Sequence, residues 1–301
     1  MRVLMINVVC GIRSTGRICT DLAKALEIQG HEVKSAYGRE KVPEEYEKCA
    51  VRIGNRIAFY INALKARFFD NEGFNAYSQT RKFLKWADEY DPDLLWIHNL
   101  HGYYINVELL FNWIKKREKM KCKWTLHDCW AFTGHGTYFS EVSCDKWKSC
   151  CFDCVQHNEY PASIIKDSSK SNFEKKRALF TGIKDMTIIT PSRWLADLVE
   201  KSFLGSYPIE INANTVDSLV FKPIESDFRE KNGLESKKII LGVASTWDKR
   251  KGLDAFVKLS TILDEQYQIV LVGLSDKQIK FLPDGIIGLT KTNNTSELAK
   301  L

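Results

Sequence analysis

The pattern of apolar and polar positions predicts strands that alternate with helices. Residues 2–9 form an almost continuous apolar run, which is typical of a strand buried on both faces of a parallel sheet. From Ile18 to Ile28 apolar side chains recur at helical spacing, and Gln29-Gly30 ends that helix. The next apolar run, residues 31–37, completes a βαβ unit. Further helices are expected over 57–69, 77–90, 107–119 and 172–181, and further strands over 94–97, 122–126, 186–190 and 209–211.

A second alternation of strands and helices begins at Lys238. It follows Phe221-Lys222-Pro223, which is expected to connect two domains. Its expected strands are 239–243, 268–272 and 286–289, with a helix over 253–263 and another that begins at Ser296. We therefore predict an α/β chain with two Rossmann-like domains and parallel sheets, residues 1–215 and 216–301. The second domain is predicted to be incomplete, because a doubly wound nucleotide-binding domain usually has five or six strands.

Composition and charge exclude some classes of protein. The net charge of +6 comes from 44 basic and 38 acidic residues without a long basic run, so no nucleic-acid partner is expected. No apolar stretch reaches about 18 residues, so no membrane-spanning helix is expected. We expect a cytoplasmic protein, whose nine cysteines are thiols or metal ligands. The aromatic and basic residues over 57–86 fit either packing inside the first domain or peripheral association with the cytoplasmic face of the inner membrane.

Candidate catalytic residues follow the strand over 122–126. His127 and Asp128 lie where that strand ends, and ligands of open α/β sheets bind beyond the carboxyl ends of the strands. Trp130 follows and could stack on a sugar ring. His98, Asn99 and His101 end the neighbouring strand, so these residues and Trp130 are expected to line the same cleft as His127.

A cysteine-rich loop spans residues 127–157. Cys144, Cys151 and Cys154 have the spacing of a zinc knuckle, and the fourth ligand would be Cys129, His135 or Cys150. Such a zinc ion would be structural, since no open coordination position is implied. The alternative is a set of reduced, half-buried thiols.

Two segments are candidates for binding phosphate groups. Gly11 and Gly16 bracket a turn before the first helix, which suits either a tight turn or contact with a phosphate or sugar. Lys249-Arg250-Lys251 lies at the start of a helix after Ser245, where cations oppose the helix dipole unless they hold an anion such as a diphosphate. The alternative is a solvated basic turn.

Several segments together resemble one enzyme family. They resemble the retaining glycosyltransferases of the GT-B fold in glycosyltransferase family 4, above all the bacterial members that build surface polysaccharides of the colanic acid and capsule type. The segments are Gly11 to Gly16 with the following helix and Gly30-His31-Glu32-Val33, His98 to Gly102, Trp124 to Trp130, Thr190 to Leu195, Phe221-Lys222-Pro223, and Lys251-Gly252-Leu253.

The resemblance implies a function for each domain. The first domain would take a glycan or polyprenyl-linked acceptor and the second a UDP or GDP sugar. Gly11 and Gly16 would lie against the donor phosphates, His127 near the reacting carbon of the sugar, and Lys251 on the diphosphate. Transfer would proceed with retention and would require no catalytic cofactor or metal.

The chain departs from the family pattern in three places. Ser245 stands where the family usually has arginine, so Arg250 is expected to substitute for it. Asn214 to Asp217 lacks the usual glycine. The paired glutamates of the family lie further along than Leu301, so a truncated chain is expected. The alternatives are an inactive remnant that binds a glycan acceptor or a partner and, as a third reading, a zinc-knuckle binding module.

Overall fold

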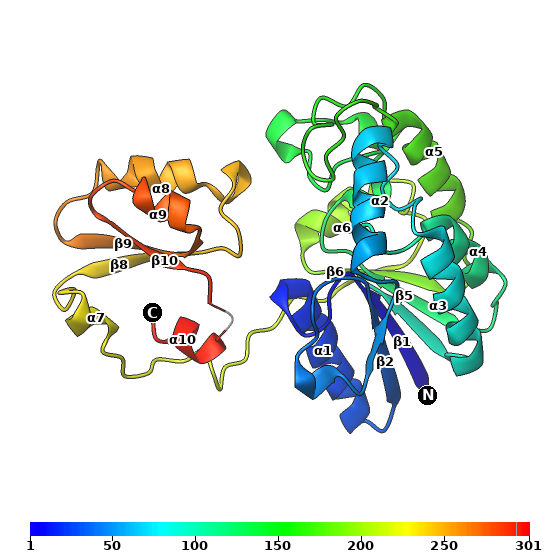
Figure 1. Ribbon diagram of the computed structural model, residues 1–301, viewed down its shortest axis with the longest axis horizontal. Helices are drawn as coiled ribbons and strands as arrows, with labels where there is room; N and C mark the ends of the chain where they lie inside the picture. Colours follow the sequence, from blue (N-terminus) through cyan, green and yellow to red (C-terminus); the bar gives the residue numbers. More distant parts are fainter. Residues whose placement is uncertain (293) are drawn as a thin grey trace. The chain divides into compact units, whose positions relative to one another are not determined.

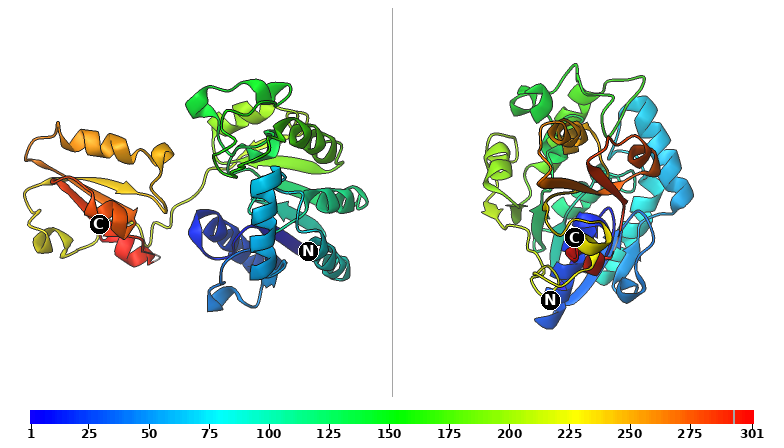
Figure 2. Two further views of the ribbon diagram at one scale, coloured as in Figure 1. Left: turned by 45° about the horizontal axis from the view of Figure 1, so that its top comes forward. Right: turned by 90° about the vertical axis from the view of Figure 1, so that its left-hand side faces the viewer.

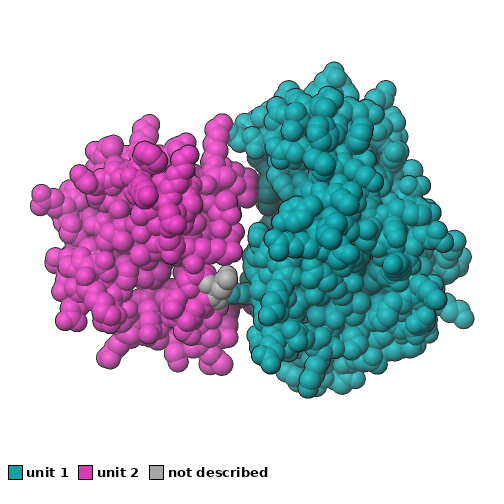
Figure 3. Space-filling model, viewed as in Figure 1, with its two compact units in different colours: residues 1–214 teal, residues 215–301 magenta. Residues whose placement is uncertain are grey.

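The computed structural model describes residues 1–292 and 294–301. The chain divides into two compact units, residues 1–214 and 215–301, which are coloured teal and magenta in Figure 3. The boundary lies one residue before the expected one.

The first unit is built on a seven-stranded sheet in which every pair of neighbouring strands is parallel (Figure 1). The strand order is β3-β2-β1-β4-β5-β6-β7, so the direction in which the sheet grows reverses between β1 and β4. The strands are β1 (Arg2–Asn7), β2 (Glu32–Tyr37), β3 (Ala50–Arg52), β4 (Leu94–Ile97), β5 (Lys121–Thr125), β6 (Met186–Thr190) and β7 (Ile209–Ile211).

Helices cover both faces of this sheet (Figure 2). Along β1 the side chains alternate, so that Val3 and Met5 pack with α1 while Leu4 and Ile6 join the larger core beneath α3 and α4. The helices are α1 (Arg13–Ile28), α2 (Arg56–Phe69), α3 (Tyr77–Tyr90), α4 (Val107–Lys115), α5 (Ser169–Phe180) and α6 (Arg193–Glu200). Short 3-10 turns lie at Glu44–Tyr46, Trp130–Phe132, Ser140–Val142 and Lys146–Lys148.

The second unit has a three-stranded parallel sheet of order β10-β9-β8. Its core joins Ile269 and Leu271 of the central strand to Trp247, with Phe256 packed alongside. The elements are β8 (Lys238–Val243), β9 (Tyr267–Leu274), β10 (Ile286–Thr290), α7 (Phe228–Lys231), a 3-10 turn (Lys249–Lys251), α8 (Leu253–Ser260), α9 (Asp276–Lys280) and α10 (Thr295–Ala299). The prediction of an α/β chain with two parallel sheets, the second smaller, is confirmed.

Some boundaries differ from the prediction. The first strand ends at Asn7, because the carbonyl of Val8 accepts the N–H groups of Gly38 and Arg39 and the chain turns there. The first helix begins at Arg13, so Gly16 lies within its first turn. The edge strand β3 and the helix α9 were not predicted, since three and five residues are too short to show a period. Among the described residues, no helix is both long and apolar enough to cross a membrane.

Candidate functional site

The site lies where the strand order reverses. The carboxyl ends of β1, β4 and β5 are neighbours in the sheet, and ligands of such sheets bind in the crevice at the reversal point. The His98 N–H donates to the carbonyl of Ile6 at 2.8 Å, and the Asn99 N–H donates to the buried Asn7 side chain at 3.3 Å. The loop after β4 is thereby fixed to the end of β1.

Two histidine rings stack at this edge. His98 Nδ1 and His127 Nε2 are 3.1 Å apart, and the rings are tilted by only 14° with centroids 5.4 Å apart. His98 is 1% exposed, and its carbonyl accepts the indole N–H of Trp124 at 3.1 Å. His127 is partly exposed. His98 is thus the buried support of His127, and both come from the predicted set.

The environment of His98 favours one tautomer. Its Nε2 is buried and has no hydrogen-bond partner in the described chain. A buried N–H without a partner is rarer and costlier than a bare acceptor. The favoured arrangement has His98 Nδ1–H donating to His127 Nε2, so that His127 carries its own hydrogen on Nδ1.

Burial keeps both rings neutral. It lowers the pKa of His98 to about 3, with a contribution from the charge of His127, and the pKa of His127 to about 4, against the opposing charge of Asp128. Since a free histidine has a pKa of about 6.5, both rings are unprotonated bases at neutral pH.

This pair predicts a pH dependence of stability. The unfolded chain binds protons at these histidines below about pH 6.5, whereas the folded chain does so only near pH 4 and 3. Their contribution to the unfolding free energy is therefore complete above pH 6.5 and falls as the pH drops toward 4. Urea unfolding of wild type and His98→Gln across this range should show the steeper fall in wild type. Parallel pH profiles would contradict the assignment, since all other titrating groups are common to both proteins.

Asp128 pairs with His101, not with its sequence neighbour. His101 Nε2 lies 2.8 Å from Asp128 Oδ2, and Asp128 Oδ1 accepts the Trp130 N–H at 2.9 Å. The other nitrogen of His101 is 3.0 Å from the Tyr160 hydroxyl. Burial acts to raise the pKa of Asp128, but the charge and hydrogen bond of His101 outweigh it and hold this pKa below the usual range. The carboxylate therefore stays ionised and orients His101.

Glu72 holds the loop that carries His101. Its Oε1 accepts the N–H groups of Gly102 and Tyr103 at 2.6 and 2.9 Å, and burial raises its pKa. Gly102 has a φ of 117°, and a Cβ there would lie 2.5 Å from the Val8 side chain. The role of Glu72 was not predicted from the sequence, because a glutamate between two helices is normally a surface group.

Trp130 packs into the core and does not present its ring to a cleft. It is 2% exposed, and the Lys176 ammonium lies 3.5 Å from the ring centroid. Lys176 also donates to the carbonyls of Trp130 and Thr133 at 2.8 and 3.1 Å. Burial lowers the pKa of this lysine to about 7. The contacts of Lys176 were not predicted from the sequence, because they depend on its burial in the folded chain.

A buried pair ties the cysteine-rich loop to the helices. His135 Nδ1 lies 2.5 Å from Asp70 Oδ1, and Asp70 Oδ2 accepts the Ser168 N–H at 2.7 Å. Asp70 is the residue after α2 and Ser168 precedes α5, so the pair joins three segments. His135, a candidate fourth zinc ligand, thus contacts a carboxylate.

The predicted zinc ligands do not converge. All nine cysteines are free thiols, and in the described chain no three His, Cys, Asp or Glu side chains stand together as a metal ion requires. Cys144, Cys151 and Cys154 line a pocket of about 290 Å³, whereas Cys129 is buried and does not line it. Burial raises the pKa of Cys151 to about 11, which disfavours the thiolate. The structural zinc and its alternative, a set of reduced, half-buried thiols, both stay predictions.

The glycine turn lies beside β1. Gly11 has a φ of 72°, and a Cβ there would lie 2.4 Å from the Tyr46 ring. A Cβ on Gly16 would lie 3.0 Å from the Val9 side chain, and the Gly11 N–H donates to the Gly16 carbonyl at 3.3 Å. Gly16 thus lets α1 approach the segment after β1 closely, whereas Gly11 leaves room for the Tyr46 ring.

The cations of the second unit lie one turn before a helix. Lys249–Lys251 form a 3-10 turn, and α8 begins only at Leu253, after Gly252 with a φ of 75°. Asp248 accepts the Lys251 N–H at 3.0 Å, so this N–H is already used within the turn. Ser245, Arg250 and Lys251 are exposed beyond the end of β8. The cations are therefore presented by the turn and not by the helix itself.

Comparison with known proteins gives one relative in sequence and several in fold. No family model matches the chain. It is 26% identical over 228 residues to a colanic acid biosynthesis glycosyl transferase, WcaC, of Escherichia coli K12, which covers 72% of this chain. The chain spans about half (55%) of the length of that relative.

The similar solved structures are glycosyltransferases. Sucrose-phosphate synthase from Thermosynechococcus elongatus has a TM-score of 0.65 at 14% identity, covering 99% of this chain and 72% of its own. Anabaena HepE in complex with UDP and glucose has a TM-score of 0.59 at 13% identity, covering 100% and 72%. WaaG, of lipopolysaccharide biosynthesis, has a TM-score of 0.58 at 13% identity, covering 98% and 72%. The chain therefore has the fold of the GT-B glycosyltransferases and resembles in sequence a bacterial glycosyl transferase of colanic acid biosynthesis.

Proposed function

We propose that the protein transfers a sugar from a nucleotide diphosphate sugar to a glycan or polyprenyl-linked acceptor, with retention, in the synthesis of a cell-surface polysaccharide. The observation that carries this proposal is the position of His127. This neutral ring lies where the strand order of the sheet reverses, and it is hydrogen-bonded to the buried His98. The similarity to WcaC supports the polysaccharide context.

In the first unit, His127 would contact the donor sugar near its reacting carbon. Its Nδ1–H would donate to the sugar or to the developing charge, because Nε2 is occupied by His98. His101, aligned by the ionised Asp128, and Asn99 would face the acceptor. Trp130 would act indirectly, because its backbone N–H holds the carboxylate of Asp128 in place.

In the second unit, Ser245, Arg250 and Lys251 would hold the donor diphosphate. In the first unit, Gly11 and Gly16 would let the turn after β1 come close to a phosphate. The bond from the sugar carbon to the leaving phosphate breaks, and a bond to the acceptor oxygen forms on the same face. The acceptor proton passes to a leaving phosphate oxygen, while the cations stabilise the growing negative charge. No metal or cofactor is needed for these steps.

The donor base can be tested directly. The HepE structures contain UDP, which makes uridine nucleotides the first candidates. Calorimetric titration of the purified 301-residue chain with UDP, GDP and their sugars should show micromolar binding that selects one base. A folded chain that binds neither nucleotide but does bind a glycan would contradict the enzyme and favour a non-catalytic acceptor-binding protein.

We predict that Lys251→Ala weakens binding of the preferred nucleotide at least about tenfold, because a charge-assisted contact to a phosphate contributes about 1.5–3 kcal/mol. The measurement is the Kd by calorimetry. Lys277→Ala, which removes another exposed lysine of the same unit, is the matched control and should bind as wild type. An unchanged Kd in Lys251→Ala would remove Lys251 from the donor site.

A further inference from the structure

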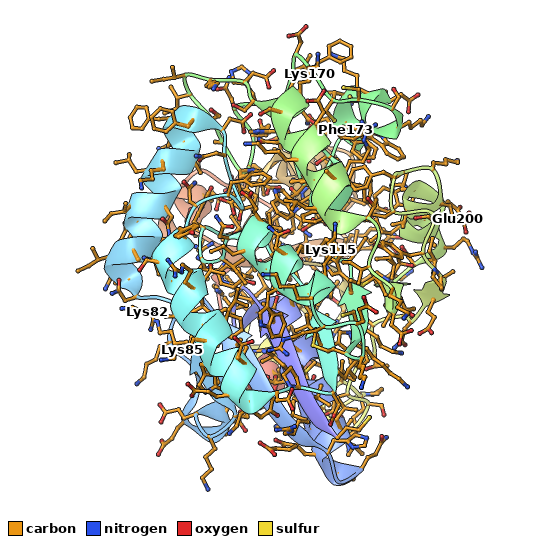
Figure 4. All side chains as sticks on the ribbon, turned by 90° about the vertical axis from the view of Figure 1, so that its right-hand side faces the viewer. Lys82, Lys85, Lys115, Lys170, Phe173 and Glu200 are labelled. Carbon is orange, nitrogen blue, oxygen red and sulfur yellow. The ribbon has the colours of Figure 1, made fainter. Side chains whose placement is uncertain are left out.

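The helix α2 carries an apolar stripe on its outer face. Its buried residues, Asn62 and Ala66, lie on the opposite side. The stripe residues are spaced three or four apart, as on one face of a helix, and are 37–72% exposed; they are Ile57, Tyr60, Ile61, Leu64 and Phe68. In Figure 4, α2 is the light blue helix at the left margin, with side chains that project outward. Exposed apolar residues in such a row mark a surface that another body covers.

A neighbouring loop extends the outer stripe. The N–H of Ile164 donates to the carbonyl of Arg67 at 2.8 Å, which fixes this loop at the end of α2. Ile164 and Ile165 are both exposed there. The apolar surface therefore spans two segments that are about a hundred residues apart in the chain.

Every charge on α2 is positive. Arg56 and Arg67 flank the outer stripe on one side and Lys65 on the other, and all three are exposed. Such side chains lay their stems along an apolar surface and keep their charges in a polar layer. Figure 4 shows further cations, Lys82 and Lys85, on the neighbouring α3. An apolar row framed by cations matches an anionic membrane surface, whereas a protein partner would need a matching row of carboxylates.

A basic pocket adjoins the beginning of α2. It has a volume of about 390 Å³ and lies beyond the carboxyl ends of β2 and β3. Four cations, Arg39, Lys41, Arg52 and Arg56, line it together with Tyr60 of the outer stripe. Its one carboxylate, Glu40, is paired with Arg13 at 2.5 Å. The amino end of α2 adds partial positive charge, so the pocket suits a phosphate group.

The basic pocket leads toward the histidines. The N–H of Arg39 donates to the carbonyl of Val8 at 3.0 Å, at the end of β1. A Cβ on Gly102, next to His101, would lie 3.6 Å from the Arg39 side chain. One residue thus borders both the basic pocket and the loop of the candidate site.

We propose that the outer stripe and the basic pocket together bind a phosphate-bearing lipid in a membrane. The basic pocket takes the phosphate of the headgroup, and the outer stripe lies in the boundary between headgroups and acyl chains. The identification of this lipid as the sugar acceptor rests on the proposed function, whereas the docking itself does not.

The first test measures binding of the whole 301-residue chain to vesicles by co-sedimentation. One set of vesicles is phosphatidylcholine alone, and the other contains about one third phosphatidylglycerol. We expect binding to the anionic vesicles at least about tenfold tighter than to the neutral ones, since each basic residue at an anionic surface contributes about a factor of five. Equal binding to both, or none by a folded chain, would overturn the proposal.

Two double variants separate the two parts of the surface. Ile61→Asp with Leu64→Asp places charges in the outer stripe, and Arg52→Gln with Arg56→Gln neutralises the basic pocket. Each should weaken binding to anionic vesicles about tenfold or more. The controls are Ile28→Asp, at an exposed apolar position outside the outer stripe, and Lys277→Gln with Lys280→Gln, both of which should bind as wild type.

Two results would count against the surface named here. Variants that bind vesicles as well as wild type would show that the surface is not the docking site. Concentration-dependent dimers of wild type, lost in the Ile61→Asp and Leu64→Asp variant, would show that a second copy covers the outer stripe. Nucleotide titration of the same variants should match wild type, so failure of docking and failure of the enzyme proposal are distinguishable.

Discussion

Replacing Asp70 with alanine is expected to lower the free energy of unfolding by about 3–5 kcal/mol. The carboxylate is buried between His135 Nδ1 at 2.5 Å and the Ser168 N–H at 2.7 Å, so alanine leaves two buried polar groups without a partner. Asp70 also ends α2 with a φ of 48°, a conformation that alanine adopts less readily than aspartate. Urea unfolding followed by circular dichroism at neutral pH measures the loss.

The chain offers a matched control in Asp91. This aspartate ends α3 with a φ of 49°, but its carboxylate is exposed and pairs only with Arg2 on the surface. Asp91→Ala therefore carries the same backbone cost without the buried pair, and its loss should stay near about 1 kcal/mol. Similar losses in the two variants would show that the backbone, not the bond to His135, accounts for the effect.

Replacing His127 with alanine is expected to reduce sugar transfer about a hundredfold or more, with a much smaller change in nucleotide affinity. The ring is the part of the histidine pair that is exposed, and its Nδ1 has no protein partner in the described chain. Loss of the ring also leaves His98 Nδ1 without its partner, which should lower stability by about 1–3 kcal/mol. Transfer of radiolabelled sugar and the Kd of the nucleotide are the two measurements.

The partly exposed His31 at the start of β2 gives the control. His31→Ala should transfer sugar like wild type, because this residue lies at the opposite end of the sheet. A His127→Ala variant that transfers sugar as fast as wild type would contradict the proposed role of His127. Equal losses of transfer and nucleotide affinity would assign His127 to donor binding instead of the chemical step.

Long, periodic elements could be predicted from the sequence. The helix over 77–90 and the strand over 186–190 have the expected bounds, because their apolar patterns are long enough to define them. The edge strand β3 and the helix α9 could not be found. Three residues carry no period, and the five residues of α9 carry little more; the spacing of Ser275 and Gln278, a capping box, was the one signal for its start.

The candidate site was predictable as a place but not as a set of bonds. Parallel strands end at one edge, so His98, His101 and His127 had to lie near one another. Which side chains pair depends on the paths of the loops, and Asp128 reaches His101 instead of His127. The buried charges of Asp70 and Lys176 could not be predicted, because their partners lie more than forty residues away along the chain.

The pairing of β1 with β4 has a consequence for synthesis on the ribosome. Val3 pairs with Leu94, so β1 has a paired strand on one side only, β2, until β4 has left the exit tunnel. Until then α1 can cover Val3 and Met5, but the core that buries Leu4 and Ile6 still lacks β4 and α4. During this interval the nascent chain exposes an unpaired apolar edge of β1, and the sheet can close around β1 only after the residues up to Ile97 have been synthesised.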